Sequence, residues 1–175
     1  LLEKERLGCG TSSRSTKLIH GGLRYLKNLS QIPMVHECLQ ERKLLLELAP
    51  DLVSPIEIFI PIYKNHPDQA WKIKIGLSLY DLLAGKKNIK KHRRISTQEL
   101  EEINPLLETK DLYKVFTYWD AQTDDKLLVR RVAHSAVKLG ARITEKCHVI
   151  SLAKTSSSWL VKVKNKKGED VEFGI

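Results

Sequence analysis

Residues 10–26 read Gly10-Thr11-Ser12-Ser13-Arg14-Ser15-Thr16-Lys17-Leu18-Ile19-His20-Gly21-Gly22-Leu23-Arg24-Tyr25-Leu26. Small and hydroxyl-bearing residues let main-chain N–H groups approach an anion closely, and cationic side chains neutralise its charge. This stretch combines serine and threonine hydroxyls with the cations Arg14, Lys17 and Arg24. Its composition is typical of a phosphate-binding segment, and a polar loop followed by an ordinary helix is the alternative.

The same stretch resembles the signature of a known family. From Thr11 to Leu26 it is similar to the run Thr-Ser-Ser-x-Ser-(Ser/Thr)-Lys-Leu-Ile-His-Gly-Gly-Leu-Arg-Tyr-Leu of FAD-dependent glycerol-3-phosphate dehydrogenases and alpha-glycerophosphate oxidases, which are glutathione-reductase-like flavoproteins. Weaker similarity continues through Glu41-Arg42, Tyr80-Asp81 and Asp124-Asp125. The resemblance implies an α/β fold, with part of a Rossmann-type FAD-binding domain interleaved with an antiparallel-sheet substrate domain.

The resemblance also implies how the chain is divided. Residues 1–50 are expected to form part of the FAD-binding domain, residues 51–122 part of the substrate-binding (cap) domain, and residues 123–175 a return to the FAD-binding domain with a β-hairpin or meander. In a dinucleotide fold the glycine-rich turn lies roughly 20 residues before an acidic residue such as Glu3. Because no such turn is present and the sequence starts on Leu1, we expect a piece of a longer enzyme, inactive alone.

Site residues follow from the resemblance position by position. Glu3 is expected at the adenosine ribose, Val149 at the adenine, and Arg24 with Tyr25 at the substrate phosphate. His20 is the candidate catalytic base, and a hydrogen bond to main chain or flavin is the alternative for this histidine. The complete FAD-binding set is Glu3, Thr11, Ser12, Ser13, Thr16, Lys17, His20, Gly21, Gly22 and Val149.

The implied reaction is oxidation of sn-glycerol 3-phosphate to dihydroxyacetone phosphate. A base takes the proton of the C2 hydroxyl while a hydride passes to N5 of FAD, so the cofactor performs the redox chemistry. Quinone or oxygen is the expected electron acceptor, and the sequence leaves the choice between dehydrogenase and oxidase open. Two alternatives remain: another flavin oxidoreductase of the amino-acid-oxidase type, and a non-enzymatic basic binding module.

The net charge of +9 predicts attraction to anions: a phosphorylated substrate, a phospholipid surface or nucleic acid. Nucleic acid is not expected, because the basic run lacks interleaved aromatic residues. That run follows an apolar segment, so it suits either lipid headgroups or a solvated loop. We expect a cytoplasmic location, with peripheral contact at the inner membrane face as an option. The run consists of Lys86, Lys87, Lys90, Lys91, Arg93 and Arg94.

Hydrophobic periodicity predicts helices over residues 30–49, 70–83 and 125–139, the last closing at Gly140. Ser96 opens a shorter helix through a capping box. Strands are predicted over residues 56–62, 113–119, 141–150, 158–164 and 171–173. Pro61 favours an edge position for the first strand. Asp120, Asp124 and Asp125 do not have the spacing of a calcium loop, and Asp124 is expected to be a helix N-cap.

Overall fold

The computed structural model describes residues 1–67 and 69–174. The chain forms two compact units, one of Lys17–Thr123 and one of Leu1–Thr16 with Asp124–Ile175. The expected boundary after residue 50 falls inside the first of these, because residues 17–50 pack with the segment that follows them. Residues 68 and 175, which belong to the expected ranges 51–122 and 123–175, lie outside the described residues.

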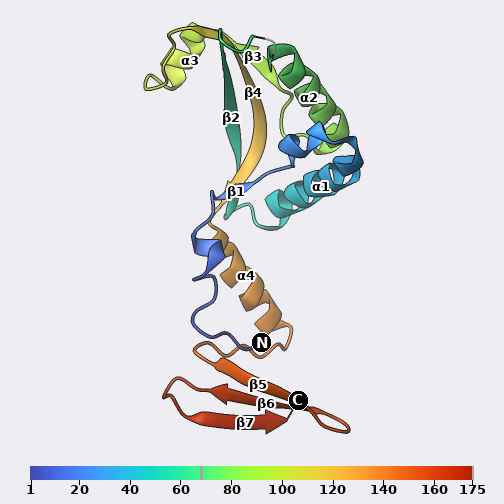
Figure 1. The fold of residues 1–175 in the computed structure, drawn as a ribbon, viewed down its shortest axis with the longest axis vertical. Helices are drawn as coiled ribbons and strands as arrows, with labels where there is room; N and C mark the ends of the chain where they lie inside the picture. The colour runs from blue at the N-terminus through green and yellow to red at the C-terminus, as the bar shows by residue number, and fades with distance from the viewer. Residues whose placement is uncertain (68, 175) are drawn as a thin grey trace. The chain divides into compact units, whose positions relative to one another are not determined.

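The unit of residues 17–123 is a helix-covered antiparallel sheet (Figure 1). Its strands are β1 (Leu18–Ile19), β2 (Val53–Tyr63), β3 (Arg93–Ile95) and β4 (Leu112–Thr123). Its helices are α1 (Ile32–Leu48), α2 (Gln69–Ala84) and α3 (Thr97–Ile103). Short 3₁₀ turns are η2 (Leu23–Lys27), η3 (Leu29–Gln31) and η4 (Gly85–Lys87).

Strand β4 lies at the centre of this sheet. It pairs with β2 on one side and with β1 and β3 on the other, always antiparallel. In the described part of the chain β2 pairs with β4 alone, so β2 is an edge strand. This confirms the position expected from its proline, since a residue without an N–H is tolerated at a sheet edge.

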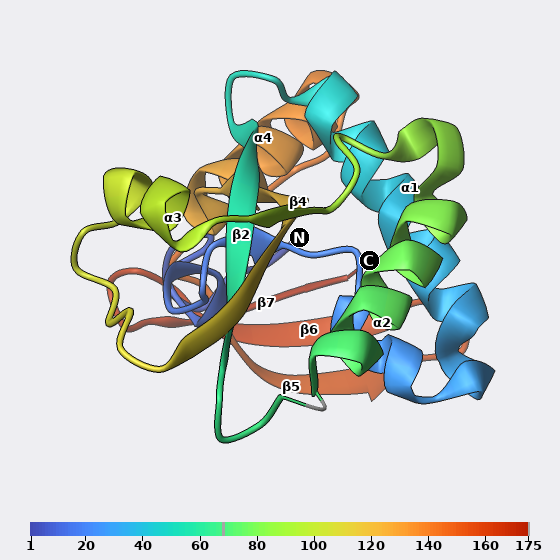
Figure 2. The same cartoon turned by 90° about the horizontal axis from the view of Figure 1, so that it is seen from above.

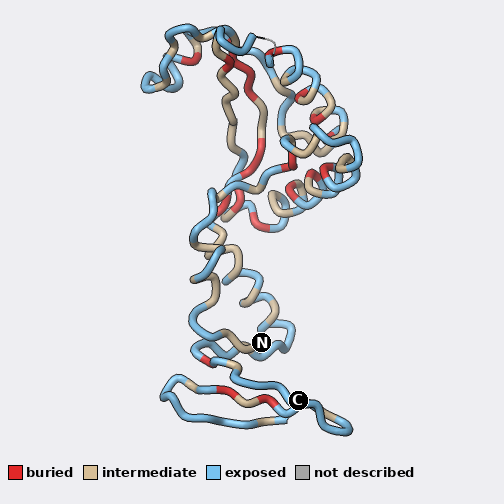
Figure 3. The backbone as a smooth tube through the Cα atoms, viewed as in Figure 1, coloured by how far each residue is buried: buried red, intermediate tan, exposed pale blue. Residues whose placement is uncertain are grey.

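The alternation of β2 and β4 gives the sheet two different faces. Ile60 lies directly opposite Phe116, and Ile58 lies opposite Tyr118, so these apolar side chains share one face. The helices α1 and α2 lie together on one side of the sheet in both ribbon views (Figures 1 and 2). Leu77 of α2 joins a buried cluster with Phe116 of β4, and buried segments run along β4 and both helices (Figure 3).

The opposite face of the sheet is covered in part by α3. Leu100 of this helix is fully buried and packs with Ile95 and Val115, while Phe59 lies against the same cluster. The helix starts as expected, because the Ser96 hydroxyl accepts a hydrogen bond from the Glu99 N–H at 3.1 Å. Burial on both faces therefore fixes the register of β4 against its neighbours.

The second unit contains η1 (Thr11–Ser13), α4 (Asp125–Lys138) and a meander of β5 (His148–Lys154), β6 (Trp159–Lys164) and β7 (Asp170–Gly174). Asp124 caps α4 by accepting a hydrogen bond from the Leu127 N–H, as predicted. Gly140 follows the helix at φ +96°, which confirms the expected left-handed stop. The expected α/β chain with an antiparallel sheet is thereby confirmed.

One strand prediction is wrong in part. The strand expected over residues 141–150 begins only at His148, and residues 141–147 are irregular apart from a parallel bridge between Leu2 and Thr144. The main-chain N–H groups of this segment bond to the first residues of the chain: Thr144 donates to the Leu1 carbonyl and Cys147 to the Glu3 carbonyl. The apolar residues of this segment have the sequence pattern of a strand, but the segment does not form a continuous ladder.

No helix in residues 1–67 or 69–174 is both long enough and apolar enough to cross a lipid bilayer.

Candidate functional site

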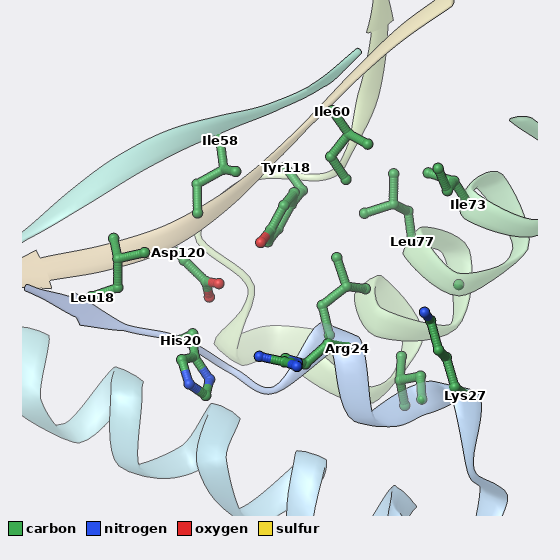
Figure 4. A pocket seen from close by; sticks show the side chains of 13 residues that line it. Leu18, His20, Arg24, Lys27, Ile58, Ile60, Ile73, Leu77, Tyr118 and Asp120 are labelled. Carbon is green, nitrogen blue, oxygen red and sulfur yellow. The ribbon is translucent and has the colours of Figure 1, made fainter. Parts of the chain in front are cut away.

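A cavity of about 360 Å³ opens within the unit of residues 17–123, lined from the sheet, η2 and α2 (Figure 4). Aliphatic side chains make most of its wall: Leu18, Leu23, Leu26, Ile58, Ile60, Ile73 and Leu77. Its polar lining consists of His20, Arg24, Lys27, Tyr118 and Asp120. An apolar chamber with a few converging polar groups is the usual form of a small-molecule site.

Two cations of η2 give the cavity a positive side. Arg24 and Lys27 both line it, and within the described residues neither has a carboxylate partner at ion-pair distance. Figure 4 shows the Arg24 guanidinium pointing toward His20, with the Asp120 carboxylate on the same side of the cavity. Since Asp120 is neutralised by Arg42, the two free cations favour an anionic ligand.

His20 and Tyr25, both expected at the site, occupy different environments. His20 is exposed and lines the cavity. The Tyr25 ring lies outside the cavity lining and packs against the buried cluster of Val35, Leu39, Tyr80 and Ala84. The two rings are 6.3 Å apart between centroids and tilted by 50°. Tyr25 therefore lies between His20 and the buried cluster formed by α1 and α2.

Tyr118 adds an uncharged hydroxyl to the cavity. Burial, together with the nearby negative charge of Asp120, raises the pKa of Tyr118 to about 12. Its side chain projects from β4 into the cavity, with the hydroxyl on the side of Asp120 (Figure 4). At neutral pH Tyr118 therefore donates or accepts a hydrogen bond without contributing charge.

The turn His20–Gly22 depends on the absence of side chains. Gly22 has φ +83°, a conformation that costs other residues free energy. Gly21 is buried, and a Cβ there would lie 2.5 Å from Leu39 Cδ2 and 2.8 Å from Tyr80 Cζ. Both glycines are therefore required by the packing of the turn, independently of any ligand.

Behind this turn lies a buried ion pair. Arg42 of α1 and Asp120 of β4 are both fully buried, with Arg42 Nη1 at 2.6 Å from Asp120 Oδ1. The Tyr80 hydroxyl of α2 donates to the same oxygen at 2.6 Å, and the Gly21 N–H donates to it at 3.0 Å. Burial and the Asp120 charge raise the pKa of Tyr80, so this hydroxyl stays protonated.

The remaining expected FAD residues lie mostly in the other unit, where they are described separately. Thr11, Ser12 and Ser13 form η1, and the Ser13 hydroxyl donates to the carbonyls of Cys9 and Gly10. The Glu3 carboxylate accepts the Glu5 N–H through Oε1. Val149 lies on β5 opposite Val163, beside the buried cluster around Cys147. Thr16 is the last residue of the N-terminal segment of this unit, and it is exposed.

The structure thus brings His20, Gly21, Gly22 and Arg24 together within one unit and holds Lys17 in that unit at φ +63°. Sequence reasoning missed Lys27, Tyr118 and Asp120 as lining residues. For Lys27 a signal existed, because it follows Arg24 by one turn. Tyr118 and Asp120 reach the cavity only through the alternation of β4, and their chain positions gave no sign of it.

A metal centre is not formed by the residues that the structure describes: no group of three or more His, Cys, Asp or Glu side chains gathers there to hold an ion.

Comparison with known proteins gives a consistent assignment. The profile of the family described as DAO, FAD dependent oxidoreductase, matches residues 1–173. Mitochondrial glycerol-3-phosphate dehydrogenase of Homo sapiens is 37% identical over 173 residues, covering 94% of this chain and 23% of that protein. D-erythritol 1-phosphate dehydrogenase of Brucella abortus is 39% identical over 166 residues, covering 94% of this chain and 32% of that protein.

A solved structure shows the same fold. The glycerol-3-phosphate dehydrogenase of Bacillus halodurans, determined with FAD, aligns with a TM-score of 0.67 at 23% identity, over 99% of this chain and 27% of that one. The chain therefore spans about a quarter to a third of the length of these relatives. Because the family profile covers nearly all of its residues, the chain belongs to the FAD-dependent oxidoreductases.

Proposed function

We propose that the protein oxidises a polyol phosphate with FAD as its cofactor, converting sn-glycerol 3-phosphate to dihydroxyacetone phosphate. The observation that carries this proposal is the pair of cations, Arg24 and Lys27, beside a cavity that also holds His20. A guanidinium clamps two phosphate oxygens through parallel hydrogen bonds, and an ammonium adds a point charge. The substrates named for the human and Brucella relatives support the same class of ligand.

The donor chemistry of the chain fits FAD. Among the described residues Glu3 Oε2 has no hydrogen-bond partner, so it remains available to accept from ribose hydroxyls. Thr11 and Thr16 are exposed residues, and their hydroxyls suit a pyrophosphate. Gly21 and Gly22 present no side chain to a flat ring. We therefore propose the FAD-binding set named from the sequence, with residues 1–50 and 123–175 serving FAD and residues 51–122 the substrate.

FAD, when bound, would supply the two-electron oxidant of the reaction, with N5 of the flavin as the proposed hydride acceptor. For the chain itself, we propose that Arg24 and Lys27 hold the phosphate so that the C2 hydroxyl lies toward His20. His20 then accepts the hydroxyl proton on an imidazole nitrogen, a role that imidazole side chains commonly take in general acid–base catalysis. Tyr118 offers a neutral hydrogen-bonding group to the carbon skeleton, and Tyr25 supports the position of the His20 ring.

A second candidate substrate is D-erythritol 1-phosphate. It is the substrate named for the Brucella relative, which is as similar to this chain as the human enzyme. It carries the same phosphate on a longer polyol, and the aliphatic wall of the cavity offers van der Waals contact to the added carbon. The two substrates are separated by the ratio of their kcat/KM values.

We propose that the electron acceptor is quinone or oxygen. If the acceptor is a quinone, we propose that the enzyme contacts the inner face of a membrane peripherally. Apolar side chains of α2 support this contact: Trp71, Ile75 and Leu82 are 59%, 59% and 75% exposed. Exposed lysines, including Lys86, follow the helix directly. Co-sedimentation with anionic but not zwitterionic vesicles, at low ionic strength, is the expected result.

The proposal is tested by anaerobic bleaching of the flavin absorbance in the full-length enzyme on addition of glycerol 3-phosphate. Glycerol, D-erythritol 1-phosphate and an amino acid are the comparison substrates. Bleaching by phosphate esters alone is the expected result. A yellow protein reduced only by the amino acid supports the amino-acid-oxidase alternative, and a colourless protein that binds polyanions in a salt-dependent way supports the basic binding module.

Arg24→Ala tests the residue that we assign to the phosphate. Loss of two charge-assisted hydrogen bonds is expected to lower kcat/KM for glycerol 3-phosphate about 100-fold or more. The ratio of flavin to protein absorbance should stay at the wild-type value. Arg142→Ala, which removes an exposed arginine of the other unit, is the matched control. An equal loss of FAD and substrate turnover in Arg24→Ala would remove Arg24 from this role.

A further inference from the structure

Asp120 gathers an unusual number of donors on one atom. Its Oδ1 accepts hydrogen bonds from Arg42 Nη1, from the Tyr80 hydroxyl and from the Gly21 N–H, at 2.6, 2.6 and 3.0 Å. The donors come from α1, α2 and the turn between β1 and η2, which are distant in sequence. Arg42 Nη1 also donates to the Trp119 carbonyl at 2.9 Å, which ties the arginine to β4 itself.

Burying the Arg42–Asp120 ion pair costs desolvation free energy, which limits what the pair contributes to stability. Both charged side chains are fully removed from solvent, and Arg42 Nε, Arg42 Nη2 and Asp120 Oδ2 have no hydrogen-bond partner among the described residues. A buried ion pair with unsatisfied atoms is often no more stable than apolar side chains of similar volume. Stability alone therefore does not account for an aspartate and an arginine at these two positions.

The acceptor oxygen is aimed at the main chain of the turn that carries the candidate base. The Gly21 N–H belongs to the peptide unit that joins His20 to Gly21, so a fixed N–H fixes the orientation of that peptide. Leu39 and Tyr80 close around Gly21 from the helix side. Three residues later the chain reaches Arg24, which lines the same cavity as His20 and Asp120.

We propose that Asp120, held in place by Arg42 and Tyr80, is a positioning residue that fixes the His20–Gly22 turn and thereby sets the place of the His20 imidazole beside the cavity. The consequence for turnover rests on the proposed function, whereas the hydrogen bond from Gly21 does not. The hydrogen bond from the Gly21 N–H is the route by which Asp120 acts on the turn. Tyr80 contributes by donating its hydroxyl to Asp120 Oδ1, and Arg42 by placing its Nη1 at 2.6 Å from the same oxygen.

Hydrogen exchange in the full-length enzyme tests the contact without any need for activity. In the wild type, the amide of Gly21 should exchange slowly, as measured by mass spectrometry on peptides that span residues 18–23. Asp120→Asn replaces the charged acceptor with a neutral one of the same shape and should speed this exchange about tenfold or more. Asp111→Asn makes the same chemical change at an exposed surface pair with Lys64 and should leave these peptides unchanged.

Asp120→Asn leaves Arg42 buried without a counter-charge and can prevent folding for that reason alone. The double variant Arg42→Met with Asp120→Asn removes both charges at similar volume, so the turn can be examined in a neutral core. It too should exchange faster at Gly21 than the wild type. Wild-type exchange in this folded double variant, or fast exchange in the wild type itself, would overturn the proposal.

Pre-steady-state kinetics tests the effect on the site. The limiting rate of flavin reduction by glycerol 3-phosphate should fall about 100-fold in the folded variants, as expected for a reacting group misplaced by about 1 Å. The dissociation constant of the substrate should change much less, because Arg24 and Lys27 are untouched. A loss confined to substrate affinity, with the limiting rate unchanged, would overturn the positioning role. If wild-type flavin ignores the substrate, the proposed function fails and the exchange experiment alone decides the contact.

Discussion

Replacing Gly21 with alanine adds a single methyl group, yet we expect it to destabilise the unit of residues 17–123 strongly. The added Cβ would lie 2.5 Å from Leu39 Cδ2 and 2.8 Å from Tyr80 Cζ, well inside van der Waals contact. Leu39 is fully buried, and the Tyr80 hydroxyl is held by Asp120 and Arg42, so neither neighbour can retreat freely. Overpacking of this kind costs about 3 kcal/mol in the free energy of unfolding.

Gly76→Ala is the matched control for this prediction. Gly76 lies inside α2, and a Cβ there would meet no atom within 4 Å. The substitution should therefore stabilise the protein by about 0.5–1 kcal/mol, because glycine is a poor residue for a helix interior. The same chemical change is thus expected to shift stability in opposite directions at the two positions.

Equilibrium urea unfolding followed by circular dichroism measures both variants. The two free energies of unfolding should differ by about 4 kcal/mol. Adding Tyr80→Phe to Gly21→Ala removes the hydroxyl that the new methyl group meets, so the double variant should recover about 1 kcal/mol relative to additivity. The packing argument is refuted if Gly21→Ala unfolds at the same urea concentration as Gly76→Ala.

Three further outcomes follow from the same structure. Leu100→Ala should lower the free energy of unfolding by about 2–5 kcal/mol, because Leu100 is fully buried against Ile95 and Val115; a loss below that range in urea melts would contradict this packing. Ser96→Ala should cost about 1 kcal/mol through loss of the α3 cap, whereas Ser96→Asp keeps an acceptor and should cost little. Tyr118 has a folded-state pKa of about 12 against about 10 unfolded, so its contribution is complete below pH 10 and is lost as the pH rises to 12. The urea midpoint of the wild type should therefore fall more steeply over that interval than that of Tyr118→Phe, and parallel curves would argue against the shift.

Local patterns in the sequence predicted the regular elements because apolar residues recur with the period of a strand or a helix. The isoleucines at 56, 58, 60 and 62 mark β2, and the apolar spacing of residues 30–49 marks α1. Caps at Ser96, Asp124 and Gly140 were equally local, since each depends on main-chain groups within four residues. The strand expected at residues 141–147 failed because its main-chain donors go to residues 1–5, far away in sequence.

The candidate site was predictable only where it is continuous in the chain. His20, Gly21, Gly22 and Arg24 lie close together in the chain, so a single motif identified them together. Arg42, Tyr80 and Asp120 meet through the packing of α1 and α2 on β4, at separations of 38 to 78 residues. Neither hydrophobic periodicity nor a helix cap predicts contacts between residues so far apart in sequence.

The prolines of β2 have a consequence for how copies of this chain meet one another. Pro55 and Pro61 lie an even number of positions apart with no bulge between them, so their nitrogens point toward the same edge of the strand. The full pairing with β4 indicates that this is the outer side. Two N–H donors are therefore missing along the outer edge of β2, so a strand from a second molecule could not form a continuous hydrogen-bonded ladder with it. The outer edge of β2 is therefore a poor template for pairing with a strand of a second copy.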